Sequence, residues 1–195
     1  MRKSRSFQRA AIIACMGAVF AATVQAHAQS FEDIVRNCNS CHGTDGRPRD
    51  KGTPIIWGQN QGYIYIQLRD YKSGSRKDEA MSDVAADLTR EDMMALAEYY
   101  ANKPWPYLAQ PSAPKEVATQ AVRANASIGC TGCHLDNYIG AGTQPRLAGQ
   151  VRDYLDKTMA DFRSRERGNN PGMTDLMQAT PSADISALAQ YLAGL

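Results

Sequence analysis

The chain is organised around a pentapeptide that occurs twice, as Cys38-Asn39-Ser40-Cys41-His42 and as Cys130-Thr131-Gly132-Cys133-His134. Two cysteines three residues apart lie on the same side of a helical turn. Their thiols can bond there to the two vinyl groups of one porphyrin, while the adjacent imidazole binds its iron. The repeated pattern therefore predicts two covalently attached c-type haems. The predicted attachment residues are Cys38, Cys41, Cys130 and Cys133, and the predicted proximal iron ligands are His42 and His134.

Two other interpretations of the four cysteines fit less well. A zinc site with four cysteine ligands usually has its cysteine pairs about 15 to 20 residues apart, and it would leave both histidines unexplained. Redox-active dithiols would usually lie in a thioredoxin-like βαβ pattern, which the sequence lacks.

The N-terminus has the organisation of a secretory signal peptide. Basic residues at positions 2, 3, 5 and 9 precede an apolar stretch, residues 10–22, that is short for a membrane span. Ala26-His27-Ala28 then supplies a small-x-small cleavage site. We therefore expect residues 1–28 to be a cleaved signal peptide and the mature chain to be periplasmic and not membrane-spanning. The alternative is an uncleaved segment that acts as an anchor.

Cleavage changes the charge of the protein. Residues 1–28 contain four basic residues and no acidic ones, so the formal net charge changes from +2 to −2. The mature chain then has no basic tail for nucleic acid or anionic lipid, and nucleic acid is not expected as a partner.

The two halves of the mature chain are related by an internal repeat. Adding 92 to the residue numbers of the first Cys-x-x-Cys-His segment gives those of the second. At a shift of 91 or 92, the repeat also pairs Pro54 with Pro145, Gln59 with Gln150, Tyr63 with Tyr154, Arg76 with Arg167 and Met81 with Met173. We therefore expect two domains, residues 29–103 and 115–195. Residues 104–114 contain four prolines and are expected to form an extended linker between them.

Each half is expected to be mainly helical. In the first half the sequence predicts helices over residues 31–38, 62–73 and about 90–102, the last one opened by a capping box at Thr89-Arg90-Glu91-Asp92. In the second half it predicts a helix from about residue 115, another over 150–164, and a third after Thr180-Pro181 with proline at its first position.

A c-type haem iron has a sixth ligand or a vacant position. The mature chain has no spare histidine or cysteine, so methionine is the remaining usual ligand. Met81 and Met173 coincide in the repeat and are the predicted ligands. Met177 is the alternative in the second half. The remaining mature methionines, at positions 93, 94 and 159, are expected to pack in the core.

These features together resemble the dihaem cytochrome c4 family, and also the dihaem cytochrome subunit of flavocytochrome c sulfide dehydrogenase. The resemblance rests on tandem Cys-x-x-Cys-His domains, each with Pro-x-x-x-Gly-Gln-x-x-x-Tyr, an Arg-rich segment, a methionine and a closing helix. It covers nearly all of the mature chain.

The resemblance implies an all-α protein of two tandem class I cytochrome c domains, each around one covalently bound haem. It implies His/Met ligation of both irons and haem propionates that face each other across a pseudo-twofold interface. It also implies that the carbonyls of Pro54 and Pro145 accept hydrogen bonds from His42 and His134.

The two halves differ directly after the histidine. His42 is followed by Gly43-Thr44-Asp45-Gly46, whereas His134 is followed by Leu135-Asp136-Asn137-Tyr138. Because the glycine turn is missing, we expect a reshaped loop beside the second haem, with Tyr138 near the haem edge. We also expect the two reduction potentials to differ.

The predicted function is single-electron transfer by a periplasmic dihaem carrier, between a donor dehydrogenase or respiratory complex and a terminal acceptor. The alternative is a tightly bound electron-accepting subunit of a flavin- or sulfur-oxidising dehydrogenase. In both cases the partners are redox proteins and the chain itself is not an enzyme. A peroxidase or a thiosulfate dehydrogenase is not expected, because the mature chain has no spare histidine or cysteine for such a site.

Overall fold

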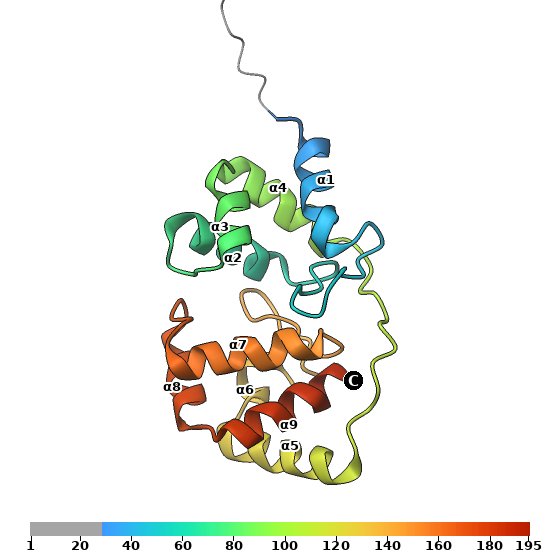
Figure 1. The fold of residues 1–195 in the computed structure, drawn as a ribbon, viewed down its shortest axis with the longest axis vertical. Coiled ribbons are helices and arrows are strands. Elements are labelled where there is room, and N and C mark those ends of the chain that lie inside the picture. The colour runs from blue at the N-terminus through green and yellow to red at the C-terminus, as the bar shows by residue number, and fades with distance from the viewer. Residues whose placement is uncertain (1–28) are drawn as a thin grey trace, which may run out of the picture.

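The structure, a computed structural model, describes residues 29–195, and the regular structure within them is entirely helical. The predicted signal peptide, residues 1–28, lies outside the described residues. Figure 1 shows two helical halves stacked along the long axis and joined by an extended segment that runs along one side. Among the described residues, no helix has the length and apolar character that a membrane crossing requires.

The helices follow the internal repeat. The first half contains α1 (Phe31–His42), α2 (Gln61–Ser73), α3 (Glu79–Ala86) and α4 (Arg90–Ala101). The second half contains α5 (Lys115–Ile128), α6 (Thr131–His134), α7 (Arg152–Ser164), α8 (Pro171–Ala179) and α9 (Ser182–Ala193). Helices α5 and α6 together correspond to α1, and the three that follow them correspond to α2, α3 and α4.

Six helices lie close to their predicted positions, although α1 continues four residues beyond the predicted end, through His42. Three further helices, α3, α6 and α8, are not predicted from the sequence and are 8, 4 and 9 residues long. Helices of this length contain too few turns for hydrophobic periodicity to identify them. Pro181 was predicted as the first residue of α9 and is instead its N-cap.

Local side chains set several helix ends. Thr89 and Asp92 form the predicted capping box at the start of α4, where each side chain accepts from the other residue's backbone N–H. Helix α2 ends at Gly74, whose φ of 74° and ψ of 5° lie in the left-handed region that glycine adopts without strain.

Each half has its own apolar core. The main helix packing stays within the halves: α2 packs with α3 and α4, while α9 packs with α5 and α7 and α7 packs with α8. The largest side chains that are fully buried in the two cores are Tyr100 and Leu96 in the first half and Met177, Ile185 and Leu188 in the second. The two halves therefore meet through a separate surface rather than through a shared core.

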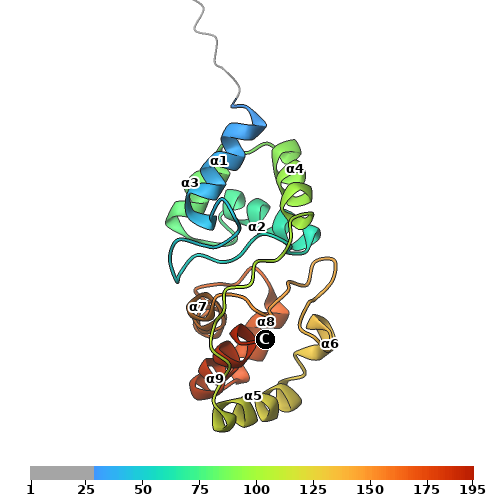
Figure 2. The same cartoon turned by 90° about the vertical axis from the view of Figure 1, so that its right-hand side faces the viewer.

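The segment between the halves, residues 104–114, contains no regular structure and is fixed to the second half (Figure 2). The side chain of Gln110 donates to the carbonyl oxygens of Gln150, at 2.9 Å, and Ala193, at 3.2 Å. Its Oε1 accepts from the backbone N–H of Arg152 at 3.0 Å. The linker thus acts as a strap with defined contacts.

Candidate haem sites

The first site lies at the C-terminal end of α1. Cys38 is partly buried, Cys41 is exposed, and both thiols are free. His42 is buried, and its Nδ1 lies 2.8 Å from the carbonyl oxygen of Pro54. This contact fixes the ring and leaves Nε2 as the nitrogen that can bind a metal, which is the usual arrangement around a ligand histidine.

The second site has the same contacts on a different backbone. Helix α5 ends at Gly129 in the left-handed conformation, and Cys133 and His134 lie on the separate short helix α6. His134 is buried, with its Nδ1 2.9 Å from the carbonyl oxygen of Pro145. The predicted hydrogen bonds to both proline carbonyls are therefore confirmed.

Burial favours the metal-binding form of both imidazoles. It lowers the pKa of His42, although the Pro54 carbonyl and Asp50 act in the opposite direction. It likewise lowers the pKa of His134 against the effect of Pro145. Neutral imidazole is the form that binds iron.

The four cysteines are not gathered into one site. Within residues 29–195, no group of three or more His, Cys, Asp or Glu side chains is arranged to hold a metal ion.

Met81 and Met173 occupy equivalent positions in α3 and α8. The backbone N–H of each donates to the N-cap side chain of its helix, Asp78 at 3.0 Å and Asn170 at 3.1 Å. Both methionines are partly buried and pack against the core of their own half. Met177, the alternative, is only 2% exposed, and the repeat pairs it with the fully buried Ala85. Met177 and Ala85 therefore pack in the cores of their own halves. Met93 and Met159 are also buried, but Met94 is 48% exposed, so its expected packing in the core is wrong.

The four residues after His134 keep the turn of the first half, so the expected reshaping is wrong for the backbone of this turn. Tyr138 N–H donates to the Leu135 carbonyl at 2.9 Å, as Gly46 N–H does to the Gly43 carbonyl at 3.4 Å. Leu135 and Tyr138 have φ of 63° and 54°, where the first half has glycines at 87° and 80°. With ψ at 164°, Leu135 is in a region that is essentially restricted to glycine.

In both halves an aromatic side chain packs at this turn, but it comes from a different position of the repeat in each half. A Cβ on Gly46 would lie 2.8 Å from the ring of Trp57, so this glycine makes room for the indole. In the second half Tyr138 is buried, and the repeat pairs Trp57 with the small residue Ala148. The first half combines Gly46 with the large Trp57, and the second combines Tyr138 with the small Ala148. This exchange of a large and a small residue explains how Tyr138 is accommodated.

A polar centre that the sequence analysis did not identify lies between the halves. Gln150 Nε2 donates to the Ile55 carbonyl at 2.9 Å, and its Oε1 accepts from the Ile55 N–H at 2.7 Å. Gln59 makes the same two bonds with Arg146, at 3.0 and 2.7 Å. Both glutamines are buried. These reciprocal contacts have the pseudo-twofold symmetry that the resemblance implies.

Two arginines are buried in the same interface. Arg76 Nη2 donates across it to the Tyr154 hydroxyl at 3.1 Å, and Arg167 Nη2 donates to the Tyr63 hydroxyl at 3.3 Å. Neither guanidinium has a carboxylate within 4.0 Å in the part of the chain that the structure describes. The repeat pairs these two residues, but nothing in the sequence indicates that they are buried.

An unpaired buried charge is costly, so this interface is suited to anionic groups. The positive charge of the two arginines also acts on the hydroxyl of Tyr154. Burial raises the pKa of its hydroxyl, but Arg76 and Arg167 outweigh that effect and lower the pKa to about 7.

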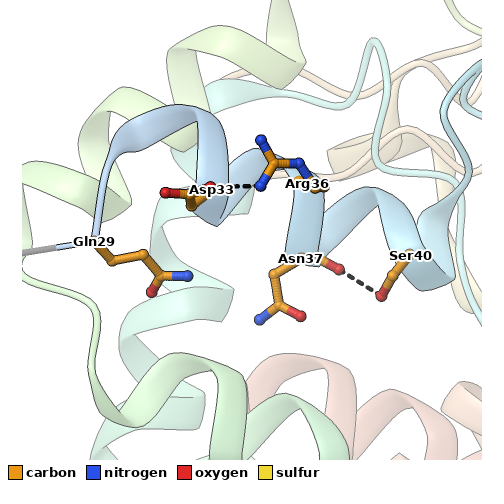
Figure 3. A pocket seen from close by; sticks show the side chains of 5 residues that line it. All are labelled: Gln29, Asp33, Arg36, Asn37 and Ser40. Carbon is orange, nitrogen blue, oxygen red and sulfur yellow. Dashed lines mark hydrogen bonds and ion pairs between the residues drawn. The ribbon is translucent and has the colours of Figure 1, made fainter.

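A polar hollow on the surface of the first half is not part of either site. It is lined by Gln29 and by four residues of α1, namely Asp33, Arg36, Asn37 and Ser40 (Figure 3). Arg36 pairs with Asp33 one turn away, and no cysteine or histidine lines the hollow.

The chain is similar to known proteins over most of its length. It is 32% identical to cytochrome c4 of Pseudomonas aeruginosa, over 81% of this chain and 83% of that protein. It is 30% identical to a thiosulfate dehydrogenase electron acceptor of Stutzerimonas stutzeri, over 81% of this chain and 78% of that protein. The solved structure of Acidithiobacillus ferrooxidans cytochrome c4 superimposes with a TM-score of 0.75 at 28% identity, over 82% of this chain and 99% of that chain. No protein-family model matches the chain.

The strained loop gives a first testable prediction. Leu135→Gly is expected to raise the free energy of unfolding by about 1 kcal/mol or more, because glycine adopts this conformation without strain. The matched change Gly43→Ala is expected to lower it, because a Cβ there would lie 2.0 Å from the Arg47 carbonyl oxygen. Denaturant titration of both variants measures the two effects. Shifts of the same sign would contradict the strain argument.

Proposed function

This chain belongs to the cytochrome c4 family, and we propose on that premise that it is a periplasmic carrier of single electrons between a donor dehydrogenase or respiratory complex and a terminal acceptor. The family consists of electron-transfer cytochromes rather than catalytic enzymes. One observation carries the proposal: the same site occurs twice, each time as two free thiols next to a buried histidine whose ring is fixed by a proline carbonyl.

The chain binds two covalent c-type haems, and a haem iron supplies a one-electron couple. We assign thioether attachment to Cys38 and Cys41 in the first half and to Cys130 and Cys133 in the second. The proximal ligands are then His42 and His134. Each imidazole donates its Nδ1–H to a proline carbonyl, which orients the ring and makes it a stronger ligand.

Met81 and Met173 are the proposed sixth ligands. Their support is the equivalent capped position that both occupy, half-buried beside the core. A thioether ligand raises the reduction potential of a haem relative to a second histidine. Thioether ligation also closes the iron to exogenous ligands, which suits a carrier and not an oxygen- or peroxide-activating enzyme.

Arg76 and Arg167 are proposed to hold the propionate carboxylates of the two haems. Their burial without a carboxylate of the described chain supports this role, because charge-assisted hydrogen bonds to a carboxylate compensate a buried guanidinium. Because both arginines lie between the halves, this arrangement would bring the two haem edges to one interface.

The domain limits and the location follow from the same proposal. We propose one haem domain at residues 29–103 and the other at 115–195, with residues 104–114 as the linker. Residues 1–28 are proposed to direct export to the periplasm, where c-type haems are attached in bacteria, and to be cleaved there.

A second candidate function is a tightly bound electron-accepting subunit of a dehydrogenase. The similarity to a thiosulfate dehydrogenase electron acceptor favours it. The same irons and ligands would serve both functions, so the difference lies in how persistent the partner contact is.

The choice between Met173 and Met177 can be tested by substitution. Met173→Leu is expected to open the second iron, so that the reduced protein binds about one carbon monoxide per chain. Met177→Leu is expected to leave carbon monoxide excluded and to lower stability by about 1 kcal/mol, as for a volume-conserving core change. Absorbance difference spectra of the reduced variants measure binding. Binding by the Met177 variant alone would reverse the assignment.

Gel filtration of a native periplasmic extract, followed at the haem Soret band, tests the carrier function. A diffusible carrier is expected to elute at about the mass of a single chain, which is 21.3 kDa before cleavage. Haem that co-elutes in fixed ratio with a larger flavin- or metal-containing polypeptide would instead identify this chain as an enzyme subunit.

A further inference from the structure

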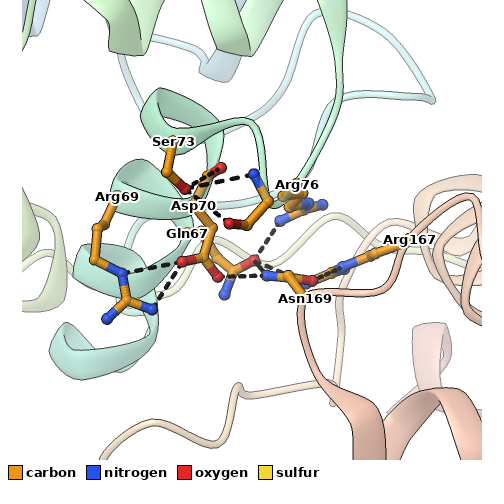
Figure 4. A network of polar contacts seen from close by, with 8 residues as sticks. Gln67, Arg69, Asp70, Ser73, Arg76, Arg167 and Asn169 are labelled. Carbon is orange, nitrogen blue, oxygen red and sulfur yellow. Dashed lines mark hydrogen bonds and ion pairs between the residues drawn. The ribbon is translucent and has the colours of Figure 1, made fainter.

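One edge of the interface holds a network that the internal repeat does not duplicate. The amide oxygen of Gln67, a buried residue of α2, accepts hydrogen bonds from three donors. These are Arg76 Nη1 at 2.8 Å, Arg167 Nη2 at 2.8 Å and Asn169 Nδ2 at 3.1 Å (Figure 4). A single side chain of the first half therefore holds both buried arginines, one from each half.

Asn169, in the second half, completes this network. Its Nδ2 also donates to Asp70 Oδ2 at 2.7 Å, and its Oδ1 accepts from Arg167 Nε at 3.0 Å. Asp70 is buried, and its other oxygen accepts from Arg69 at 2.8 and 3.0 Å. Asn169 thus connects the buried carboxylate of one half to the guanidinium of the other.

The equivalent edge lacks this arrangement. The repeat places Thr158 where the first half has Gln67, so no amide oxygen is available there. Asp161 takes the place of Asp70 but pairs with Lys157 of its own helix. Lys77, which precedes the N-cap of α3 as Asn169 precedes that of α8, is exposed and has no ion pair or side-chain hydrogen bond among residues 29–195.

The other contacts across the interface leave the angle between the two halves undetermined. The reciprocal bonds of Gln59 and Gln150 are equivalent under the repeat and have the same form in both directions. Symmetric contacts of this kind join the halves but do not distinguish one edge from the other. The network from Gln67 to Asn169 occurs on one edge only. Gln67 and Asp70 are buried, where hydrogen bonds are strong and an unpaired group is costly, whereas Asn169 is partly exposed.

We propose that Gln67, Asp70 and Asn169 form a one-sided clamp that sets the angle between the halves and so positions the two haems for electron exchange. The clamp orients Arg76 and Arg167. It also holds the two halves together at that edge of the interface, so that they do not rotate relative to each other. These are positioning residues, because they act through the arginines and the domain angle. The inference rests on the proposed function, in which each half carries one haem. The rate of electron exchange between two centres falls steeply as the distance between them increases. A small change in the angle between the halves therefore changes this rate measurably.

Asn169→Ala in the full-length, haem-loaded protein tests the clamp, with Lys77→Ala as the matched control on the open edge. The first measurement is the rate of electron redistribution between the two haems after pulsed one-electron reduction. The second is the radius of gyration by small-angle X-ray scattering. The alanine variant at Asn169 is expected to redistribute electrons several-fold more slowly and to have a larger radius of gyration, while the control matches the wild type in both.

The exchanged pair Asp70→Asn with Asn169→Asp gives a second, independent readout. Asn at position 70 can donate to Asp at position 169, which still accepts from Arg167, so the contact between these two positions is restored with its direction reversed. The hydrogen bond to Gln67 is lost, because a carboxylate at position 169 cannot donate. The double variant is therefore expected to recover part of the redistribution rate that Asn169→Ala loses. Recovery of none of that rate, or a rate for Asn169→Ala equal to that of Lys77→Ala, would overturn the proposal.

Haem content separates this result from a failure of the proposed function. Each variant is assayed for haem by its pyridine haemochrome. A wild type that carries fewer than two haems per chain would contradict the proposed function itself. With two haems in every variant, an unchanged scattering profile and an unchanged rate for Asn169→Ala would contradict the clamp alone.

Discussion

Two buried guanidinium groups, with no carboxylate of the described chain within 4.0 Å of either, are the constraint on which this structure depends. Arg76 and Arg167 lie between the halves, where each contacts a tyrosine from the opposite half. Burial of unpaired charge is unfavourable by several kcal/mol per ion, so a stable interface requires anionic partners. In the proposed arrangement the propionate carboxylates of the two attached haems supply that charge. The interface of the apoprotein, which lacks these carboxylates, is then expected to be less stable than that of the haem-loaded protein.

The sequence identifies the haem sites and much of the fold because the relevant signals are local. The cysteines and histidines are adjacent in the chain, and long helices have apolar positions at a regular spacing. The paired prolines and methionines become informative through the repeat. The interface was not predictable in the same way, because Gln59, Gln150 and the two arginines are polar residues that would usually be exposed. Their burial depends on docking of the second half. The sequence gives even less indication of the role of Asn169, because its contacts with Gln67 and Asp70 have no counterpart in the repeat.

The differences between the halves are as informative as the repeat. Leu135 and Tyr138 retain a turn that glycine forms in the first half, and Ala148 opposite Trp57 provides the space for Tyr138. A tightly retained turn at a strained backbone indicates that the position of the preceding histidine is maintained at a cost in stability. The two sites therefore share the contact between histidine and proline carbonyl and differ in what packs beside it. Such differences in packing and charge give two haems unequal potentials within one chain.

The proposed arrangement places two one-electron centres against one buried cationic interface. Spectroelectrochemical titration of the full-length, haem-loaded protein, alongside its Arg167→Gln variant, tests this arrangement. We expect uptake of two electrons per chain and lower potentials in the variant, because removal of a nearby positive charge stabilises the oxidised iron. Uptake of one electron per chain, or potentials that the substitution leaves unchanged, would contradict it.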